Sequence, residues 1–407
     1  MRANTVNVIG LGYIGLPTAA LLASNGYSVR GVDINPDVVA TINQRKIHIL
    51  EPGLEAFVQS AVTDGYLIAS TIPEAADVHI ICVPTPFQDD GGIPQPRLDY
   101  VFAATRSLAS LLKPGDMIIL ESTSPVGTTE GMKEVLSALG VNVGMIHMAY
   151  CPERVLPGKI MAELVENDRV VGGLTSAATR AVAAFYKTFV RGAVLETDSK
   201  TAEMCKLAEN SFRDVNIAFA NELSILCANA GISVWDLISY ANHHPRVNIL
   251  RPGSGVGGHC IAVDPWFIVA GDPENAQIIR KAREVNSHKT EWAINQIKIV
   301  VADASANLGK KPRIACLGLT FKPDIDDMRG SPAAYIALSL LTQGYDIVAV
   351  EPNIDSHDQF LLVTLEDAVK SADVFAVLVG HGEFMSKSLK ASLKQRPVVD
   401  LCGVLCE

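Results

Sequence analysis

The fold is decided by one stretch near the start of the chain, Val6-Asn7-Val8-Ile9-Gly10-Leu11-Gly12-Tyr13-Ile14-Gly15. Residues 6–9 predict a short apolar strand, residues 17–25 a helix stopped by Gly26, and residues 27–32 a second strand that ends at Asp33. The three glycines allow the backbone to approach a pyrophosphate, whose charge would lie at the helix N-terminus. Asp33 would accept both ribose hydroxyls and repel a 2′-phosphate. We therefore expect a Rossmann-type domain that binds NAD in preference to NADP.

Two further predicted strands end in polar tips. The strand at residues 78–83 is followed by Thr85, and the strand at residues 117–121 by a Ser- and Thr-rich segment that holds Thr123 and Thr129. Ligands of a doubly wound sheet lie beyond the carboxyl ends of its strands, so these tips are expected to line the cofactor cleft. Ordinary strand-end turns would have the same composition.

The first signal returns near the end of the chain. Residues 344–353 resemble residues 26–35, and they are preceded by an apolar strand at 313–319 and a helix at 331–343. The turn between these two elements, residues 320–324, lacks the glycine triplet. The C-terminal part therefore predicts a second Rossmann-like domain, whose natural occupant is a nucleotide of the substrate rather than a second NAD.

A long helix lies between the two copies. Asp198 or Ser199 caps it, and it runs past Cys227 to Gly231. Because most of its sides are apolar, we expect it to be buried between domains or across a dimer. Lys206, Asn210 and Arg213 share one face, at i, i+4 and i+7, and form either a solvated stripe or part of a cleft.

These segments predict an α/β protein with two Rossmann-like doubly wound domains joined by a central helical domain. The expected boundaries are residues 1–197 for the NAD-binding domain, 198–304 for the central helical and dimerisation domain, and 305–407 for the domain that binds the substrate's nucleotide.

A glycine-rich loop, Gly255-Val256-Gly257-Gly258-His259-Cys260, carries one cysteine and is followed by Asp264. A thiolate can trap an aldehyde as a thiohemiacetal, which loses a second hydride to give a thioester that water cleaves. Backbone N–H groups of such a loop can stabilise an oxyanion. Beside an NAD fingerprint, the loop therefore predicts oxidation of an alcohol to a carboxylate at one site, with Cys260 as nucleophile. A buried structural cysteine is the alternative.

Other side chains are candidates to assist this chemistry. Lys206 could stabilise the oxyanion or shuttle a proton, and Asp264, Glu153 and Thr123 could orient or deprotonate the hydrolytic water. Carboxylates at turns also cap helices. Five basic residues are candidates to supply the positive charge that a diphosphate needs, and surface ion pairing is the alternative role of each: Arg154, Arg213, Arg246, Lys322 and Arg329.

Composition narrows the class of protein. The 407 residues carry a net charge of −10, which argues against non-specific nucleic-acid binding. No apolar stretch approaches the length of a membrane span. The eight cysteines fit no zinc spacing, so no metal is expected, and their scatter indicates a reducing, cytoplasmic compartment.

By these residues the chain resembles the UDP-glucose/GDP-mannose dehydrogenase family along its whole length. Four blocks, residues 151–158, 210–216, 244–248 and 257–265, are similar to the branch of this family that acts on UDP-N-acetyl-D-mannosamine. The resemblance implies oxidation of C6 of that sugar nucleotide to the uronate with two NAD, for bacterial surface-polysaccharide synthesis. It also implies a homodimer built on the central helix, in which the partner completes part of the site.

The resemblance further implies roles for matching residues. Cys260 would be the nucleophile and Lys206 the general acid/base. The expected NAD contacts are Tyr13, Ile14, Asp33, Thr85, Thr129 and Arg329, beside the turn glycines Gly10, Gly12 and Gly15. The expected UDP-sugar contacts are Arg154, Val155, Lys206, Asn210, Arg213, His244, Arg246, Gly257, Phe321 and Lys322.

One position departs from the family. Relatives carry a basic substrate contact in the last strand, where this chain has Cys402. Either another cation replaces it, or the nucleotide is held less firmly. UDP-glucose, UDP-N-acetylglucosamine and UDP-N-acetylgalactosamine therefore stay open as alternative substrates.

Three other classes of protein agree less well with the sequence. A two-electron dehydrogenase of the beta-hydroxyacid type would not need the second Rossmann repeat or the cysteine loop. A short-chain epimerase would need Tyr-x-x-x-Lys, which the chain lacks. An NAD-sensing module would leave Cys260, Lys206 and Asp264 without a shared purpose.

Overall fold

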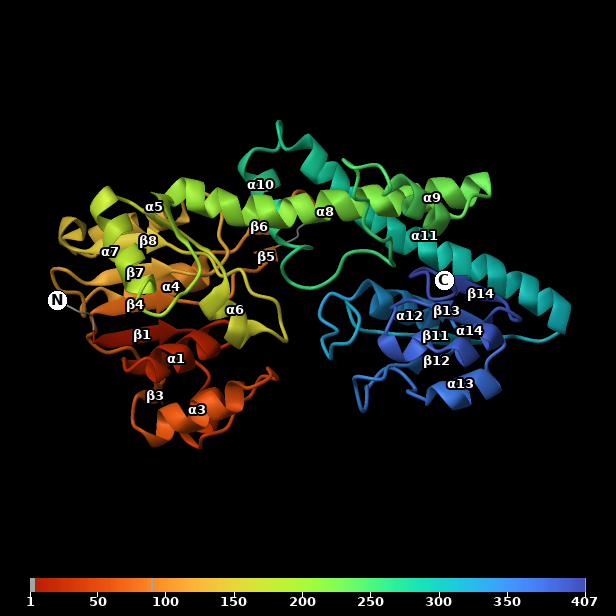
Figure 1. The fold of residues 1–407 in the computed structure, drawn as a ribbon, viewed down its shortest axis with the longest axis horizontal. Coiled ribbons are helices and arrows are strands. Elements are labelled where there is room, and N and C mark those ends of the chain that lie inside the picture. The colour runs from red at the N-terminus through yellow and green to blue at the C-terminus, as the bar shows by residue number, and fades with distance from the viewer. Residues whose placement is uncertain (1–3, 89–90, 407) are drawn as a thin grey trace. The chain divides into compact units, whose positions relative to one another are not determined.

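The computed structural model describes residues 4–88 and 91–406. Its contacts divide the chain into two compact units (Figure 1). The first unit comprises Met1–Glu209 with Trp266–Gly271, and the second comprises Asn210–Pro265 with Asp272–Glu407. None of the helices in the described ranges is long and apolar enough to cross a membrane.

The first unit is built on a sheet whose described strands follow the order β10-β9-β8-β7-β4-β1-β2-β3. All neighbours are parallel except β8 and β9. The strand order switches between β1 and β4: the chain adds β2 and β3 on one side of β1, and then returns to add β4 and the later strands on the other side. Ligands of such sheets bind at this kind of switch point. The strands are Thr5–Ile9 (β1), Ser28–Val32 (β2), Leu67–Ser70 (β3), Val78–Ile81 (β4), Met117–Leu120 (β7), His147–Tyr150 (β8), Arg169–Gly173 (β9) and Val194–Asp198 (β10), with a small hairpin of Phe87–Gln88 (β5) and Gln95–Pro96 (β6).

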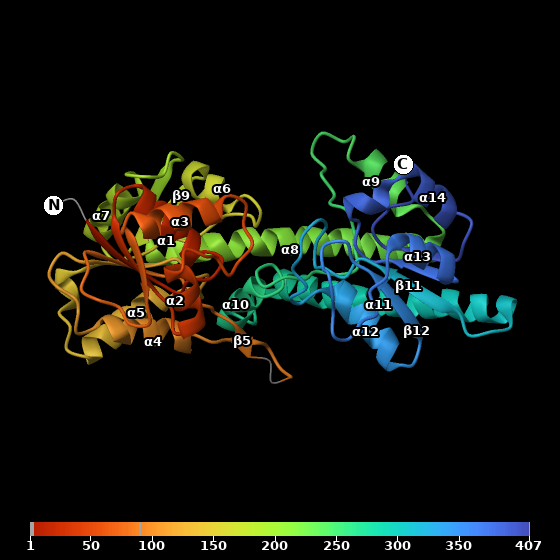
Figure 2. The same cartoon turned by 90° about the horizontal axis from the view of Figure 1, so that it is seen from below.

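Helices cover both faces of this sheet. Figure 2 shows α1, α3, α6 and α7 on one side of the strands and α4 and α5 on the other. Because both faces are covered, the central strands are buried on both sides, and every residue of β4 is buried. The helices are Gly15–Ser24 (α1), Pro36–Asn43 (α2), Leu54–Thr63 (α3), Asp99–Leu108 (α4), Thr128–Ala138 (α5), Ile160–Glu166 (α6) and Ser176–Tyr186 (α7), with a 3₁₀ turn at Val143–Met145.

The central segment supplies α8 (Ser199–Ala230), α9 (Val234–Ala241), α10 (Asp264–Gly271) and α11 (Gln277–Leu308). Asp198 caps α8 as expected, because its carboxylate accepts the Thr201 N–H at 3.0 Å. The apolar faces of α8 are only partly buried within one chain. Leu207 is buried, but Phe212, Phe219 and Leu226 are 71%, 54% and 55% exposed. This stripe is therefore not buried between the domains of one chain, and the expected burial across a dimer stays a prediction.

The second unit contains a parallel sheet of order β12-β11-β13-β14. Apolar residues of α11 and α12 cover one face, and those of α13 and α14 cover the other. The elements are Arg313–Leu317 (β11), Pro332–Thr342 (α12), Asp346–Val350 (β12), Leu365–Ser371 (α13), Val374–Val377 (β13), Gly382–Met385 (a 3₁₀ turn), Lys387–Leu393 (α14) and Val398–Asp400 (β14). The predicted α/β fold class, with two Rossmann-like doubly wound domains and a central helical segment, is confirmed.

Candidate functional site

The glycine turn after β1 has the geometry of a nucleotide-binding turn. Gly10 has a φ of +90°, and a Cβ there would lie 2.6 Å from the Cys82 carbonyl oxygen at the end of β4. A Cβ at Gly15 would lie only 1.7 Å from the Gly10 carbonyl oxygen, so α1 can begin this close to the strand only with glycine. Nothing lies within 4 Å of the Cβ position of Gly12, which is exposed. These features fit a pyrophosphate at the start of α1, beside the half-buried Tyr13 and Ile14.

Asp33 follows β2 and faces this turn. One carboxylate oxygen accepts the Leu11 N–H at 2.9 Å, and the other accepts the Asn35 N–H at 2.9 Å. The side chain is half-buried. A carboxylate fixed in this way beyond the strand end has lone pairs left for ribose hydroxyls. The turn and Asp33 together fit NAD, as the sequence predicted.

The threonines that follow β4 and β7 differ in their burial. Thr85 is half-buried, and its hydroxyl donates to the Thr123 carbonyl oxygen at 2.6 Å. Thr129 is fully buried, and its N–H and hydroxyl both donate to Glu203 at 2.8 and 2.7 Å. Glu203 also accepts the Gly127 N–H, so this carboxylate caps the start of α5. The contacts of Thr85 and Thr129 with NAD stay predictions.

Glu153 lies in a buried polar cluster at the carboxyl ends of the strands. It is 7% exposed, pairs with Arg169 at 3.4 Å and accepts the Val155 N–H. Burial raises its pKa, while Arg169 opposes the rise. Tyr186 completes the cluster by donating to Glu121 at 2.6 Å. A raised pKa suits a carboxyl that exchanges protons with water, so the arrangement is compatible with the expected role.

Three further candidates of the first unit, Arg154, Val155 and Lys206, are half-buried. The Arg154 guanidinium pairs with Glu209 at 2.6 Å and donates to the Asp168 carbonyl oxygen at 3.1 Å. Val155 packs partly buried against the core, and Lys206 is half-buried on α8.

In the second unit, the glycine-rich loop is held from two sides. Its start is tied to helices, because the Gly253 N–H donates to Asn221 of α8 at 2.9 Å and Thr290 of α11 donates to the Ser254 carbonyl oxygen at 3.0 Å. Its middle packs on the turn after β11. A Cβ at Gly257 would lie 2.8 Å from that of Phe321, and the Gly258 N–H donates to the Arg329 carbonyl oxygen at 3.2 Å. Only glycine permits this close approach.

Cys260 follows this loop and differs from the other seven cysteines. All eight lie in the described residues and none forms a disulfide, but Cys260 alone is exposed. The next turn links it to Asp264, whose N–H donates to the Cys260 carbonyl oxygen at 2.8 Å. Asp264 is 3% exposed, and Asn210 donates to its carboxylate at 2.5 Å. The structure therefore places an accessible thiol one helical turn from a fixed, buried carboxylate.

The remaining candidates of the second unit lie on exposed segments. Arg213 is exposed on α8, and His244 and Arg246 are exposed after α9, where the Arg246 N–H donates to the His244 ring at 3.3 Å. Lys322 is half-buried. Arg329 forms an ion pair with Asp327 at 2.7 Å.

Sequence reasoning missed a buried polar chain that supports the cysteine loop. Arg283 and Asn286 of α11 donate to Asp214 of α8 at 2.6 and 2.8 Å, and Asn221 donates to Asn286 at 2.9 Å. Asn221 then accepts the Gly253 N–H. Asp214 and Asn221 are seven residues apart and so share one face of α8, and this spacing was the available signal, since buried polar groups need partners.

Comparison with known proteins agrees with this geometry. Residues 4–190, 200–288 and 315–407 match the NAD binding domain, the central domain and the UDP binding domain of the UDP-glucose/GDP-mannose dehydrogenase family. UDP-N-acetyl-D-mannosamine dehydrogenase of Escherichia coli K12 is 52% identical over 99% of this chain and 100% of its own length. NDP-N-acetyl-D-galactosaminuronic acid dehydrogenase of Ralstonia nicotianae is 50% identical over 98% of this chain and 96% of its own.

A solved structure is similar over the same extent. UDP-D-ManNAc dehydrogenase of Pyrococcus horikoshii matches with a TM-score of 0.89 and 37% identity, covering 99% of this chain and 96% of the other. The match to all three family domains, with the glycine turn, Asp33 and the Cys260 loop in place, shows that the chain belongs to the UDP-glucose/GDP-mannose dehydrogenase family.

Proposed function

We propose that the protein oxidises C6 of UDP-N-acetyl-D-mannosamine to the carboxylate, using two NAD per sugar nucleotide. The observation that carries this proposal is Cys260, the single exposed thiol among eight cysteines, on a loop that glycines hold against the turn after β11. An alcohol dehydrogenase that stops at the aldehyde has no use for such a thiol.

The proposed chemistry has two oxidations separated by a covalent step. NAD, when bound at the turn after β1, takes up one hydride in each oxidation. The C6 alcohol first becomes the aldehyde, to which Cys260 Sγ adds, forming a C–S bond and an oxyanion that is protonated. Loss of a proton and a second hydride from this thiohemiacetal gives the thioester. Water then adds to the thioester carbon, the C–S bond breaks, and the thiol and the carboxylate are released.

Named side chains of this chain would assist these steps. We assign Lys206 to stabilising the oxyanion and moving its proton, and Asp264 to orienting or deprotonating the hydrolytic water. Asn210 supports the second role, because its hydrogen bond fixes the Asp264 carboxylate. Glu153, with its raised pKa, and Thr123 are further candidates for positioning that water.

We assign binding of the two ligands to the residues that the family resemblance named. Gly10, Gly12, Tyr13, Ile14, Gly15, Asp33, Thr85, Thr129 and Arg329 would hold NAD. Arg154, Val155, Lys206, Asn210, Arg213, His244, Arg246, Gly257, Phe321 and Lys322 would hold the UDP-sugar. The domains would be residues 1–197, 198–304 and 305–407, a division that the matched family ranges support.

We further propose that the protein works as a homodimer in the cytoplasm. Phe212, Phe219 and Leu226 are exposed at seven-residue spacing, so they share one face of α8 that a second copy would bury. All eight cysteines lie in the described residues and none forms a disulfide, which supports a reducing compartment. The molar mass in solution tests the dimer, and a monomer at micromolar concentration would contradict it.

The decisive experiment measures NADH formed per sugar nucleotide consumed. Purified protein is incubated with NAD and, separately, UDP-N-acetylmannosamine, UDP-N-acetylgalactosamine, UDP-N-acetylglucosamine and UDP-glucose. We expect two NADH per molecule of the first substrate and no released aldehyde. One NADH with a free aldehyde would disprove the covalent mechanism, whereas a preference for another sugar would change only the substrate.

Substitution of the cysteine provides the second arm of this experiment. Cys260→Ala is expected to abolish acid formation while NAD binding survives. Cys406→Ala is the matched control, because this half-buried cysteine belongs to the same unit, and it should keep wild-type activity. Normal acid formation by Cys260→Ala would remove Cys260 from the nucleophile role.

A further inference from the structure

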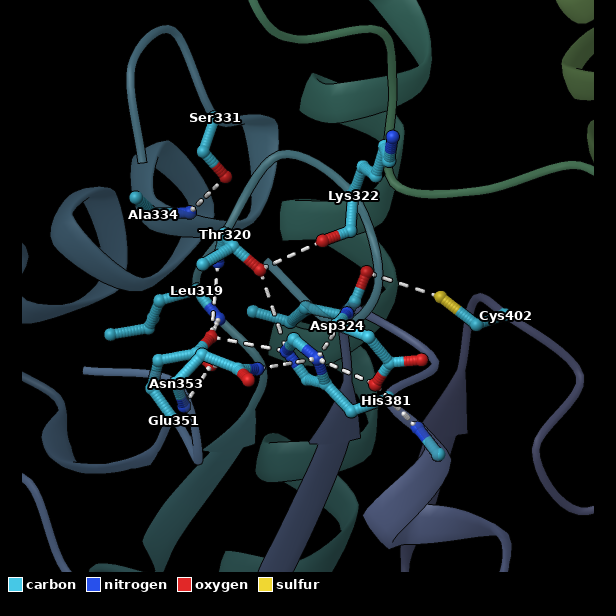
Figure 3. A network of polar contacts seen from close by, with 12 residues as sticks. Leu319, Thr320, Lys322, Asp324, Ser331, Ala334, Glu351, Asn353, His381 and Cys402 are labelled. Atoms are coloured by element: carbon cyan, nitrogen blue, oxygen red, sulfur yellow. Dashed lines mark hydrogen bonds and ion pairs between the residues drawn. The ribbon is translucent and has the colours of Figure 1, made fainter. Parts of the chain in front are cut away.

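His381 is a fully buried histidine of the second unit that the proposed reaction does not use. It follows β13, and its ring lies at the centre of the polar network in Figure 3. One ring nitrogen, Nε2, lies 3.1 Å from the Glu351 carboxylate. The other, Nδ1, lies 3.0 Å from the Asp324 amide nitrogen and 3.2 Å from the side-chain nitrogen of Asn353.

These partners determine which nitrogen of the ring carries the proton. A backbone N–H can only donate, so Nδ1 must accept from Asp324, and Nδ1 therefore carries no proton. The hydrogen then resides on Nε2 and points at Glu351. Burial alone would raise the pKa of Glu351, but hydrogen bonds from His381 and from the Leu319 N–H lower it to about 2. The ring is thus a neutral bridge between an ionised carboxylate and a backbone N–H.

The bridge fixes both ends of a short segment. At one end, Glu351 accepts the N–H groups of Leu319 and Thr320 at 2.7 and 3.1 Å. At the other end, Asp324 has a φ of +59°, a left-handed conformation that a non-glycine residue adopts only at a cost. The Asp324 carboxylate also accepts the Gly382 N–H at 2.9 Å, so the residue is held by two bonds from the His381 segment.

Phe321 and Lys322 lie between these two fixed ends. The Thr320 hydroxyl donates to the Lys322 carbonyl oxygen at 3.0 Å, which closes the turn around them. The Phe321 ring would lie 3.0 Å from a Cβ at Gly258, so it forms the surface on which the glycine-rich loop packs. Cys260 is two residues farther along the chain. The shape of this turn therefore affects both the expected substrate contacts and the cysteine loop.

We propose that His381 is a positioning residue for the reaction: as the Nε2–H tautomer it holds residues 319–324 in the conformation that presents Phe321 and Lys322 to the UDP-sugar and supports the Gly257–Gly258 loop. It acts through Glu351 and Asp324 and contacts no substrate. The link to the substrate rests on the proposed function, whereas the hydrogen bonds of His381 do not depend on that function.

Two substitutions of His381 each remove one hydrogen bond, to Glu351 or to Asp324, and keep the other. The amide of asparagine reaches the position of Nδ1, so His381→Asn can still accept the Asp324 N–H but no longer donates to Glu351. The longer glutamine reaches the position of Nε2, so His381→Gln can donate to Glu351 but loses the acceptor for Asp324. His357→Gln is the control, because His357 lies in the same unit and its ring accepts only the local Gln359 N–H in the contacts described.

Steady-state kinetics give the first readout. His381→Gln is expected to raise KM for the UDP-sugar roughly tenfold, the cost of one unsatisfied buried hydrogen bond. KM for NAD should stay within about twofold, and His381→Asn should keep the UDP-sugar KM close to the wild-type value. If both variants lose thermal stability alike and keep the wild-type KM, His381 only supports the fold and the proposal is wrong.

Amide hydrogen exchange gives a readout that needs no substrate. The amides of Phe321, Asp324 and Gly258, each of which donates a hydrogen bond, are expected to exchange roughly tenfold faster in His381→Gln, and at wild-type rates in His357→Gln. Wild-type protection of these amides in His381→Gln would overturn the proposal. If the wild-type protein oxidises none of the sugar nucleotides, the proposed function fails, and hydrogen exchange still decides whether His381 holds the turn.

Discussion

The turn after β1 and the turn after β11 start from the same backbone geometry and then diverge. Gly10 and Gly318 have φ values of +90° and +88°, and their N–H groups donate to Val32 and Val350 at 2.7 and 2.8 Å. In the first unit, α1 begins at Gly15. In the second, α12 begins only at Pro332, so a long segment replaces the tight turn.

The acidic residues at the ends of β2 and β12 follow the same plan. Asp33 accepts the Leu11 N–H and Glu351 accepts the Leu319 N–H, and each also accepts an N–H two residues along its own chain. Asp33 is half-buried and faces the nucleotide turn, whereas Glu351 is 6% exposed and bonded to His381.

This difference shows that a strand–glycine–strand–acid pattern predicts the backbone fold but does not predict which ligand binds to it. In the first unit the turn is short, so the N-terminus of α1 lies next to it, where a bound anion would be stabilised, and Asp33 stays half-exposed. In the second unit the acid is saturated by internal donors, and the longer turn supports the cysteine loop. The first copy therefore has the geometry to bind a dinucleotide, whereas under the proposed function the second copy shapes the loop of the covalent step.

The largest expected effect separates a ligand-binding glycine from a structural one. Gly12→Ala should weaken NAD binding about a hundredfold, because a methyl group would displace a pyrophosphate from the exposed backbone by about 1 Å or more. Its unfolding free energy should stay unchanged, since nothing lies within 4 Å of that Cβ position. Titration calorimetry and urea unfolding measure the two quantities.

Gly318→Ala is the matched variant in the second unit. A Cβ there would lie 2.5 Å from that of Val379, so this variant should lose roughly 1–3 kcal/mol of stability and keep its NAD affinity. Weaker NAD binding by Gly318→Ala, or a loss of stability in Gly12→Ala, would contradict the assignment of NAD binding to the first turn and of a structural role to the second.

A smaller effect distinguishes the two acids. Asp33→Ala should relax the discrimination against NADP roughly tenfold, because it removes both ribose hydrogen bonds and the repulsion of the 2′-phosphate. Glu351→Gln should leave the ratio of NAD to NADP activity unchanged but lower the unfolding free energy by roughly 1–3 kcal/mol. An altered cofactor preference in Glu351→Gln would contradict the assignment of the dinucleotide to the first unit.

The sequence predicted the features that depend on neighbours along the chain. Strand–turn–helix units, the cap at Asp198 and the repeat that pairs Asp33 with Glu351 all follow from local pattern. The fold class and the family followed from these and from the Cys260 loop. Hydrophobic period and glycine position carry this information within about twenty residues.

Contacts that join distant segments were not predictable in the same way. Glu203 binds Thr129 across 74 positions, and His381 meets Glu351 across 30, and a single sequence gives no signal for either pairing. The stripe of Phe212, Phe219 and Leu226 is exposed within one chain, and the sequence left open whether a domain or a second copy covers it. Apolar spacing shows that a face needs covering but not which chain covers it.

The last prediction concerns acid stability and tests the saturated carboxylate directly. The pKa of Glu351 is lowered from 4.5 to about 2 in the folded protein, mainly by His381 and by the N–H of Leu319 against the opposing effect of burial. Its stabilisation is therefore fully present above the unfolded pKa and is lost as the pH falls towards the folded one. Between about pH 6 and about pH 3 the wild type should lose about 2 kcal/mol that Glu351→Gln does not lose. Urea unfolding of both proteins over this range measures the difference. Parallel pH profiles would mean that Glu351 is not held as an ionised acceptor, and the contrast with Asp33 would then rest on burial alone.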